Sequence, residues 1–210
     1  MSTLLQAFQK RPGLSMHTEE YVMKPHLKRG LFSNYYLEEL LPKEEEFKIP
    51  LLELERYLEA INRVWDKRYL STLNEPQLRK HFLDKVFEIL GWAVDVEPPT
   101  PSGEWSRHPD YALFDSKEDL KIAQKVSKED YFKGTFCLGE AKRWGRPLDK
   151  KIKADLEDPQ NPSLQISRYL WLTEVKWGIL TDGRHWRLYE RETSKSLDIF
   201  YEIDLEDQRS

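Results

Sequence analysis

One stretch of the chain, FCLGEAKRWG at residues 136–145, restricts the fold more than any other. Its first half is apolar and indicates a buried β-strand, yet Glu140 and Lys142 follow in the same run. Alternate residues of a strand point to opposite faces, so these two charged side chains share one face while Cys137 and Ala141 point to the other. A buried carboxylate is costly unless it is paired. The fold must therefore satisfy this pair, either as an ordinary ion pair or as part of a metal site.

The composition limits what else the chain can be. Its 210 residues suit one domain with a substantial core. Asp and Glu (37) outnumber Lys and Arg (33), so any site for a polyanion must be local. The single cysteine, Cys137, excludes an internal disulfide framework and a cysteine-based zinc cluster. Because the sequence contains no signal peptide and no apolar run long enough for a membrane span, we expect a cytoplasmic protein.

The apolar pattern predicts two amphipathic helices in the first half. Apolar residues recur at steps of three and four from Leu51 to Trp65, which is typical of a helix with one buried face. A second helix is predicted from Asn74, a favourable N-cap with Gln77 three residues later, to Gly91. We interpret residues 1–48 as an arm, with a short helix at 35–41, that docks on a core domain of residues 49–210.

Strands are predicted in the other apolar runs, at residues 92–96, 111–114, 135–143 and 196–203, and on both sides of Asp182-Gly183. Asp-Gly between two such runs is the strongest short signal for a hairpin. A solvated helix is expected over 116–130, and Asn161-Pro162 begins another helix that runs to residue 174. Together these elements predict an α/β fold, a mixed central β-sheet flanked by α-helices, with the hairpin extending one edge.

A second carboxylate joins Glu140 if two of these strands pair. Asp110 comes directly before the strand at 111–114 and directly after Pro109. If that strand runs antiparallel to the strand of Glu140, Asp110 lies beside Glu140. Two hard oxygen ligands of this kind suit magnesium, which binds through one or two carboxylates together with water and substrate phosphate.

The Pro109-Asp110 pair followed by Glu140-Ala141-Lys142 resembles the PD-(D/E)xK nuclease superfamily. The segments NEPQLRKHFLDKVFEILGW, GEAKRWGRPLD, NPSLQISRYL and WGILTDGRHWRLYE resemble, in order, the N-terminal nuclease domain of fused type IIG restriction-modification enzymes and, more distantly, type I restriction subunits. The likeness covers residues 31–205. It implies a restriction-endonuclease-like core and magnesium-dependent hydrolysis of double-stranded DNA, with manganese able to substitute.

The resemblance also implies roles for individual residues. Asp110, Glu140 and the backbone carbonyl of Ala141 would hold the metal, and Lys142 would position or polarise the attacking water. Glu75 matches an acidic residue near the start of the first core helix that adds to the metal shell in many relatives. An acidic side chain in the first turn of a helix is also favoured by the helix dipole alone, so both interpretations of Glu75 remain open.

Further residues are candidates for DNA contact. Gln165 and Tyr169 match a Q-x-x-x-Y pattern that follows the catalytic strand in related nucleases. Because they are four residues apart on a helix, they share one face. Two interpretations remain open: the pair reaches the DNA or the metal site, or it only caps a packed surface. The basic segment at 142–153, which includes Arg143, Arg146 and Lys150, would hold phosphates beside the cut unless it is a solvated loop.

Two functions follow from these observations. The first is an active nuclease of a restriction-modification system, and the second is a nuclease-derived module without turnover that serves in DNA binding or assembly. The intact set of Asp110, Glu140 and Lys142 favours the first, because decay usually strikes such residues first. The sequence contains no methyltransferase motifs and no clear sequence-reading module, so we expect methyltransferase and target-recognition domains as partners. Whether a homodimer forms to cut both strands is open.

Overall fold

The structure is a computed structural model that describes residues 27–28, 30–48, 50–99, 108–152 and 160–206. Much of the predicted N-terminal arm, and Lys153 of the basic segment, therefore lie outside the described residues. The described part of the arm contributes Leu37 and Leu41 to the main hydrophobic core. The division of the chain into an arm and a core domain stays a prediction.

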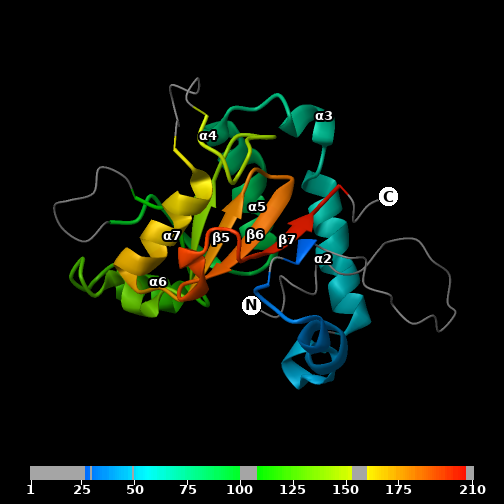
Figure 1. The fold of residues 1–210 in the computed structure, drawn as a ribbon, viewed down its shortest axis with the longest axis horizontal. Coiled ribbons are helices and arrows are strands. Elements are labelled where there is room, and N and C mark those ends of the chain that lie inside the picture. Colours follow the sequence, from blue (N-terminus) through cyan, green and yellow to red (C-terminus); the bar gives the residue numbers. More distant parts are fainter. Residues whose placement is uncertain (1–26, 29, 49, 100–107, 153–159, 207–210) are drawn as a thin grey trace, which may run out of the picture.

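A mixed sheet of seven strands forms the centre of the described residues (Figure 1). The strands are β1 (Leu27–Lys28), β2 (Ala93–Val96), β3 (Tyr111–Phe114), β4 (Cys137–Ala141), β5 (Trp177–Thr181), β6 (His185–Glu190) and β7 (Tyr201–Asp204). Their order across the sheet is β1-β7-β6-β5-β4-β3-β2. Neighbours pair antiparallel except β4 and β5, which are parallel. The sheet confirms the predicted α/β class and is consistent with a restriction-endonuclease-like core.

The hairpin at Asp182-Gly183 is confirmed, but its predicted position at a sheet edge is wrong. β5 pairs with β4 on one side, and β6 pairs with β7 on the other, so the hairpin lies inside the sheet. The two edges are formed instead by β1, which pairs with β7, and by β2, which pairs with β3. A hairpin signal specifies the turn between two strands and carries no information about which strands pair outside it. Gly183 has φ = 86°, a left-handed conformation that favours glycine in this turn.

The predicted helices are present, with short additional turns between them, but the helix predicted over 116–130 is too long and ends at Ala123. The α-helices are α2 (Leu51–Val64), α3 (Lys67–Leu70), α4 (Glu75–Leu78), α5 (Asp84–Ile89), α6 (Lys117–Ala123) and α7 (Pro162–Thr173). The π-helical turns are η1 (Tyr36–Leu40) and η4 (Arg79–Leu83). The 3₁₀ turns are η2 (Leu41–Lys43), η3 (Glu45–Phe47), η5 (Tyr131–Gly134) and η6 (Thr193–Lys195). No helix of the described residues is both long and apolar enough to cross a membrane.

The helix predicted from Asn74 to Gly91 consists of α4, η4 and α5 in direct succession. Asn74 accepts a hydrogen bond from the backbone N–H of Gln77 at 2.9 Å, and the Gln77 side chain accepts one from the backbone N–H of Asn74 at 3.2 Å. This is the predicted capping box. The π-helical turn η4 interrupts the α-helical register, and such turns occur frequently at functional sites. Arg79 is its first residue.

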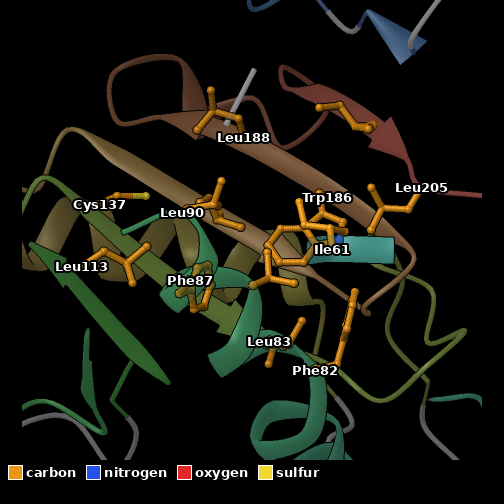
Figure 2. Close-up of a cluster of buried hydrophobic side chains, with 14 of the residues drawn as sticks. Ile61, Phe82, Leu83, Phe87, Leu90, Leu113, Cys137, Trp186, Leu188 and Leu205 are labelled. Atoms are coloured by element: carbon orange, nitrogen blue, oxygen red, sulfur yellow. The ribbon is translucent and has the colours of Figure 1, made fainter. Parts of the chain in front are cut away.

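Helices cover both faces of the sheet, and each face has its own core. On one face, Phe82, Leu83 and Phe87 of the α4–α5 run pack with Ile61 of α2 and with Trp186 of β6 (Figure 2). This layer holds the helix that begins at Asn74 against the sheet.

On the other face, α7 packs against β4 and β5. Gly178 of β5 allows the close approach, because a Cβ atom at this position would lie 2.9 Å from Cγ1 of Ile166. Leu138 and Leu180 of the sheet and Ile166 and Leu170 of α7 belong to this second core. The helix that carries Gln165 and Tyr169 is thereby fixed over the strand that carries Glu140.

Candidate active site

Asp110 and Glu140 meet beside the end of β4, as predicted from antiparallel pairing. Tyr111 of β3 pairs with Gly139 of β4, so Asp110, the residue before Tyr111, lies opposite Glu140. The backbone N–H of Ala141 donates a hydrogen bond to Oδ2 of Asp110 at 2.7 Å. The register of the two strands therefore brings together two carboxylates that are distant in the sequence.

Glu140 and Lys142 form a buried ion pair. Nζ of Lys142 donates to Oε1 of Glu140 at 2.8 Å, and the two side chains are only 3% and 4% exposed for Lys142 and Glu140, respectively. Oε2 of Glu140 is also buried, and it has no hydrogen-bond partner among the described residues. Leaving a buried polar atom unpaired is unfavourable. The site thus contains an acceptor that is open to a cation or a donor.

The pKa values of both carboxyl groups are raised, chiefly by burial. Burial and the neighbouring charge of Asp110 raise the pKa of Glu140 to about 8, although Lys142 acts in the opposite direction. Burial also raises the pKa of Asp110, against the guanidinium of Arg79 and the N–H of Ala141, which both lower it. Carboxyl groups perturbed by burial and by a second charge are concentrated at functional sites.

Arg79 also belongs to the site, although no motif in the sequence identifies it. Its Nη1 donates to Oδ1 of Asp110 at 2.7 Å, and its guanidinium lies over the ring of Tyr111, 5.2 Å from the centroid. Arg79 comes four residues after Glu75 on the same helical run, which places the two side chains near one face. This spacing from a predicted site residue was the one signal in the sequence that could have identified Arg79.

The other predicted site residues surround this centre. Glu75 is partly buried in the first turn of α4, and its charge contributes to the raised pKa of Glu140. Gln165 and Tyr169 are buried on α7, where Nε2 of Gln165 donates to the Tyr169 hydroxyl at 3.2 Å. Burial and the charge of Glu140 raise the pKa of Tyr169. The structure therefore brings Glu75 and Tyr169 within electrostatic reach of Glu140.

The three predicted phosphate-binding residues occupy different environments. Arg143 and Lys150 are exposed. Arg146 is only 3% exposed, and its guanidinium donates to the backbone carbonyls of Pro147, Lys150 and Gln160 at 2.9, 3.1 and 2.9 Å. Arg146 thus fixes the shape of the loop that carries the two exposed cations. Their contact with DNA stays a prediction.

The oxygen donors of the site meet part of what a metal ion requires. The described residues include no group of three or more His, Cys, Asp or Glu side chains arranged to hold a metal. Asp110 and Glu140 provide two carboxylates, and the unpartnered Oε2 of Glu140 is a hard oxygen donor. Magnesium commonly takes one or two carboxylates and completes its shell with water and substrate oxygens. The residues fit magnesium in this mode and do not form a closed all-protein cage.

Comparison with known proteins gives one distant relative. The type II restriction enzyme and methyltransferase RM.Eco57I of Escherichia coli is 27% identical to this chain over 137 residues. The match covers 65% of this chain but only 12% of that protein. No family model matches the chain, and no solved structure matches it significantly. The chain is thus distantly related to a restriction enzyme and corresponds to a small part of it.

Proposed function

We propose that this chain is a PD-(D/E)xK nuclease of a restriction-modification system, and that it hydrolyses phosphodiester bonds of double-stranded DNA with magnesium. One observation carries the proposal: Asp110 and Glu140 lie side by side, Lys142 is bonded to Glu140, and Oε2 of Glu140 is open. The distant relative is a restriction enzyme and methyltransferase, which supports the same class of reaction.

Asp110, Glu140 and the backbone carbonyl of Ala141 are the residues that would hold magnesium, with Glu75 nearby. Manganese, another divalent cation that accepts oxygen ligands, would substitute for it. When bound, the ion would lower the pKa of an attacking water and offset the charge that builds on the phosphate.

The protein's own contribution is to fix the reacting groups. The N–H of Lys142 donates to the carbonyl of Thr181 at 2.8 Å, which extends the β4–β5 pairing by one residue and fixes the backbone of Lys142. The Lys142 ammonium holds Oε1 of Glu140, so that Oε2 is the oxygen left for other partners. The same ammonium would orient a water molecule for attack on phosphorus. Positioning of this kind accounts for a large share of enzymatic rate enhancement.

Duplex DNA is the partner that fits this site. Arg143 and Lys150 would bind phosphates beside the cut, while the buried Arg146 would shape their loop. Gln165 and Tyr169 would contact the DNA or the metal from α7. Because the match covers only 12% of the relative, methyltransferase and target-recognition functions would come from other domains.

A plasmid assay tests the proposal. Supercoiled plasmid is incubated with the protein, with Asp110→Asn and with Lys142→Ala, in magnesium, in manganese and in EDTA. We expect nicking or linearisation by the parent protein in either metal and none by the two variants. Equal activity of all three proteins would contradict the proposal, because the cleavage would then arise elsewhere. If none of them cuts, a gel shift that survives both substitutions would instead support a DNA-binding module without turnover.

A further inference from the structure

The charged side chains at the centre of the candidate site are balanced in pairs. Arg79 lies 2.7 Å from Asp110, and Lys142 lies 2.8 Å from Glu140. In their ionised forms these four groups carry no net charge. A divalent cation would add two positive charges to a region in which none of the four side chains is more than 13% exposed. Charge added without compensation to such a region is unfavourable.

Of the two basic side chains, Arg79 is the one that can more easily leave its ion pair, because it is less buried than Lys142. Lys142 is 3% exposed and follows directly on the central strand β4. Arg79 lies on a helix at the sheet's end, and Nη1 also lies 3.4 Å from Oε1 of Glu97, whose side chain is 57% exposed. The guanidinium of Arg79 is thus in contact with a surface group as well as with the buried Asp110.

The chemistry of arginine indicates which group the Arg79 guanidinium would bind after it leaves Asp110. A guanidinium is planar and always charged, and its donors match two oxygens of a phosphate at once. A DNA phosphate that reaches Glu140 must also approach Asp110, and therefore Arg79, because these residues adjoin. The phosphate brings a negative charge that offsets part of the charge of a divalent cation.

We infer that Arg79 exchanges partners during binding: it pairs with Asp110 in the free protein and turns to the DNA phosphate when a divalent cation occupies the site. This inference rests on the proposed nuclease function. Arg79 would thereby make metal binding weak without DNA and stronger with it. It is a coupling residue for two ligands and also a direct contact to the substrate.

The first experiment measures magnesium binding without DNA, by isothermal titration calorimetry. Replacing Arg79 by glutamine removes the cation that competes for Oδ1 of Asp110, so R79Q should bind magnesium about tenfold more tightly than the parent protein. R79K is the matched control that keeps the charge, and its affinity should stay close to that of the parent protein. Unchanged or weaker magnesium binding by R79Q would overturn the inference.

The second experiment measures binding of a short fluorescent duplex by anisotropy, in EDTA and in Ca²⁺, with the duplex checked for cleavage on a gel. In EDTA, Arg79 remains on Asp110, so R79Q and the parent protein should bind equally. In Ca²⁺ the variant should bind about tenfold more weakly, since one charge-assisted contact is lost. An equal loss in both conditions would contradict partner exchange and indicate a permanent phosphate contact.

R79K provides a second test of DNA binding, which applies even if R79Q does not fold. A lysine cannot make the two-point contact of a guanidinium, so R79K should lose part of its DNA affinity in Ca²⁺ and none in EDTA. Full DNA affinity of R79K in Ca²⁺ would overturn the inference.

Asp110→Asn separates this inference from the proposed function. If D110N binds magnesium as well as the parent protein does, the metal is elsewhere and the proposed function itself fails. If D110N loses binding while R79Q is unchanged, only the role of Arg79 is wrong.

Discussion

Two buried ion pairs lie on the same face of the sheet, and they differ in what they leave unpaired. Glu140 and Lys142 are two residues apart on and just after β4, whereas Arg187 of β6 and Glu202 of β7 pair directly across two strands. By strand alternation, all four side chains point away from the core that contains Trp186. Burial alone therefore does not distinguish a catalytic pair from a structural one.

The surroundings of the two pairs make the distinction. The guanidinium of Arg187 lies over the ring of Phe200, 4.2 Å from the centroid, and Nη2 lies 3.7 Å from a second carboxylate, Asp149. Its buried Nη1 has no described partner, but this group is a donor and cannot bind a cation. The Glu140 pair leaves an acceptor unpaired instead: Oε2 of Glu140 is buried, has no described hydrogen-bond partner and lies next to the carboxylate of Asp110. This unpaired buried acceptor is the feature on which the proposed metal-dependent function rests.

The largest effect that would test the difference between the two ion pairs is the loss of DNA cleavage when a carboxylate is replaced. Replacing Glu140 by glutamine keeps the shape of the side chain but removes its charge, so we expect cleavage of plasmid DNA to fall by about a thousandfold, the cost of losing a group that stabilises charge in the transition state. Glu202→Gln is the matched control and should keep the parent rate below its melting temperature. Similar losses in both variants would remove the distinction between the two pairs.

The loss of stability should be larger in E202Q than in E140Q, the reverse of the order expected for cleavage. E202Q leaves the buried Arg187 without its main partner, so the free energy of unfolding should fall by about 3 kcal/mol. E140Q should cost less, about 1 kcal/mol at pH 7, because burial and the charge of Asp110 raise the pKa of Glu140 and so disfavour the charged form that the substitution removes. Urea unfolding without divalent cations measures both values. A larger loss in E140Q than in E202Q would mean that the Glu140 pair mainly stabilises the fold.

The parts of the site that could be predicted are those set by local patterns and strand alternation. Asn74 and Gln77 specify a helix start through bonds between near neighbours, and Asp182-Gly183 specifies a tight turn. The meeting of Asp110 with Glu140 needed only one further assumption, antiparallel pairing, which is correct.

The parts that could not be predicted depend on contacts between distant segments. The hairpin's place inside the sheet follows from its pairing with β4 and β7, which its own residues do not specify. Arg79 reaches Asp110 from a π-helical turn, whose altered register no hydrophobic pattern indicates. Arg146 is a basic residue, yet both terminal nitrogens of its guanidinium donate to backbone carbonyls of its own loop and of Gln160. Sequence shows the charge of a side chain but not its direction.

A smaller effect on stability should show whether the cap of the helix that carries Glu75 and Arg79 is needed for cleavage. Asn74→Ala removes the capping bond to the N–H of Gln77 and should lower the free energy of unfolding by about 1 kcal/mol. Cleavage should persist, because Glu75 and Arg79 remain on a helix held by its core contacts. Ser116→Ala removes the equivalent cap of α6, away from the site, and is the control. If N74A lost cleavage while S116A kept it, the capping box would belong to the catalytic arrangement.

The smallest effect concerns a third, more exposed charged contact, at the turn between β5 and β6. A hydrogen bond to Asp182 raises the pKa of His185, helped by the charge of Asp204 and opposed by burial. The protonated imidazole therefore stabilises the fold fully below the unfolded pKa of about 6.5, and this contribution is lost as the pH rises through the higher folded pKa. His185→Gln should lower the free energy of unfolding by under about 1 kcal/mol near pH 5.5 and by progressively less toward pH 8.5. Thermal melting across this range measures the difference. A difference independent of pH would show that His185 acts through packing, and that charge matters for stability only in the fully buried pairs.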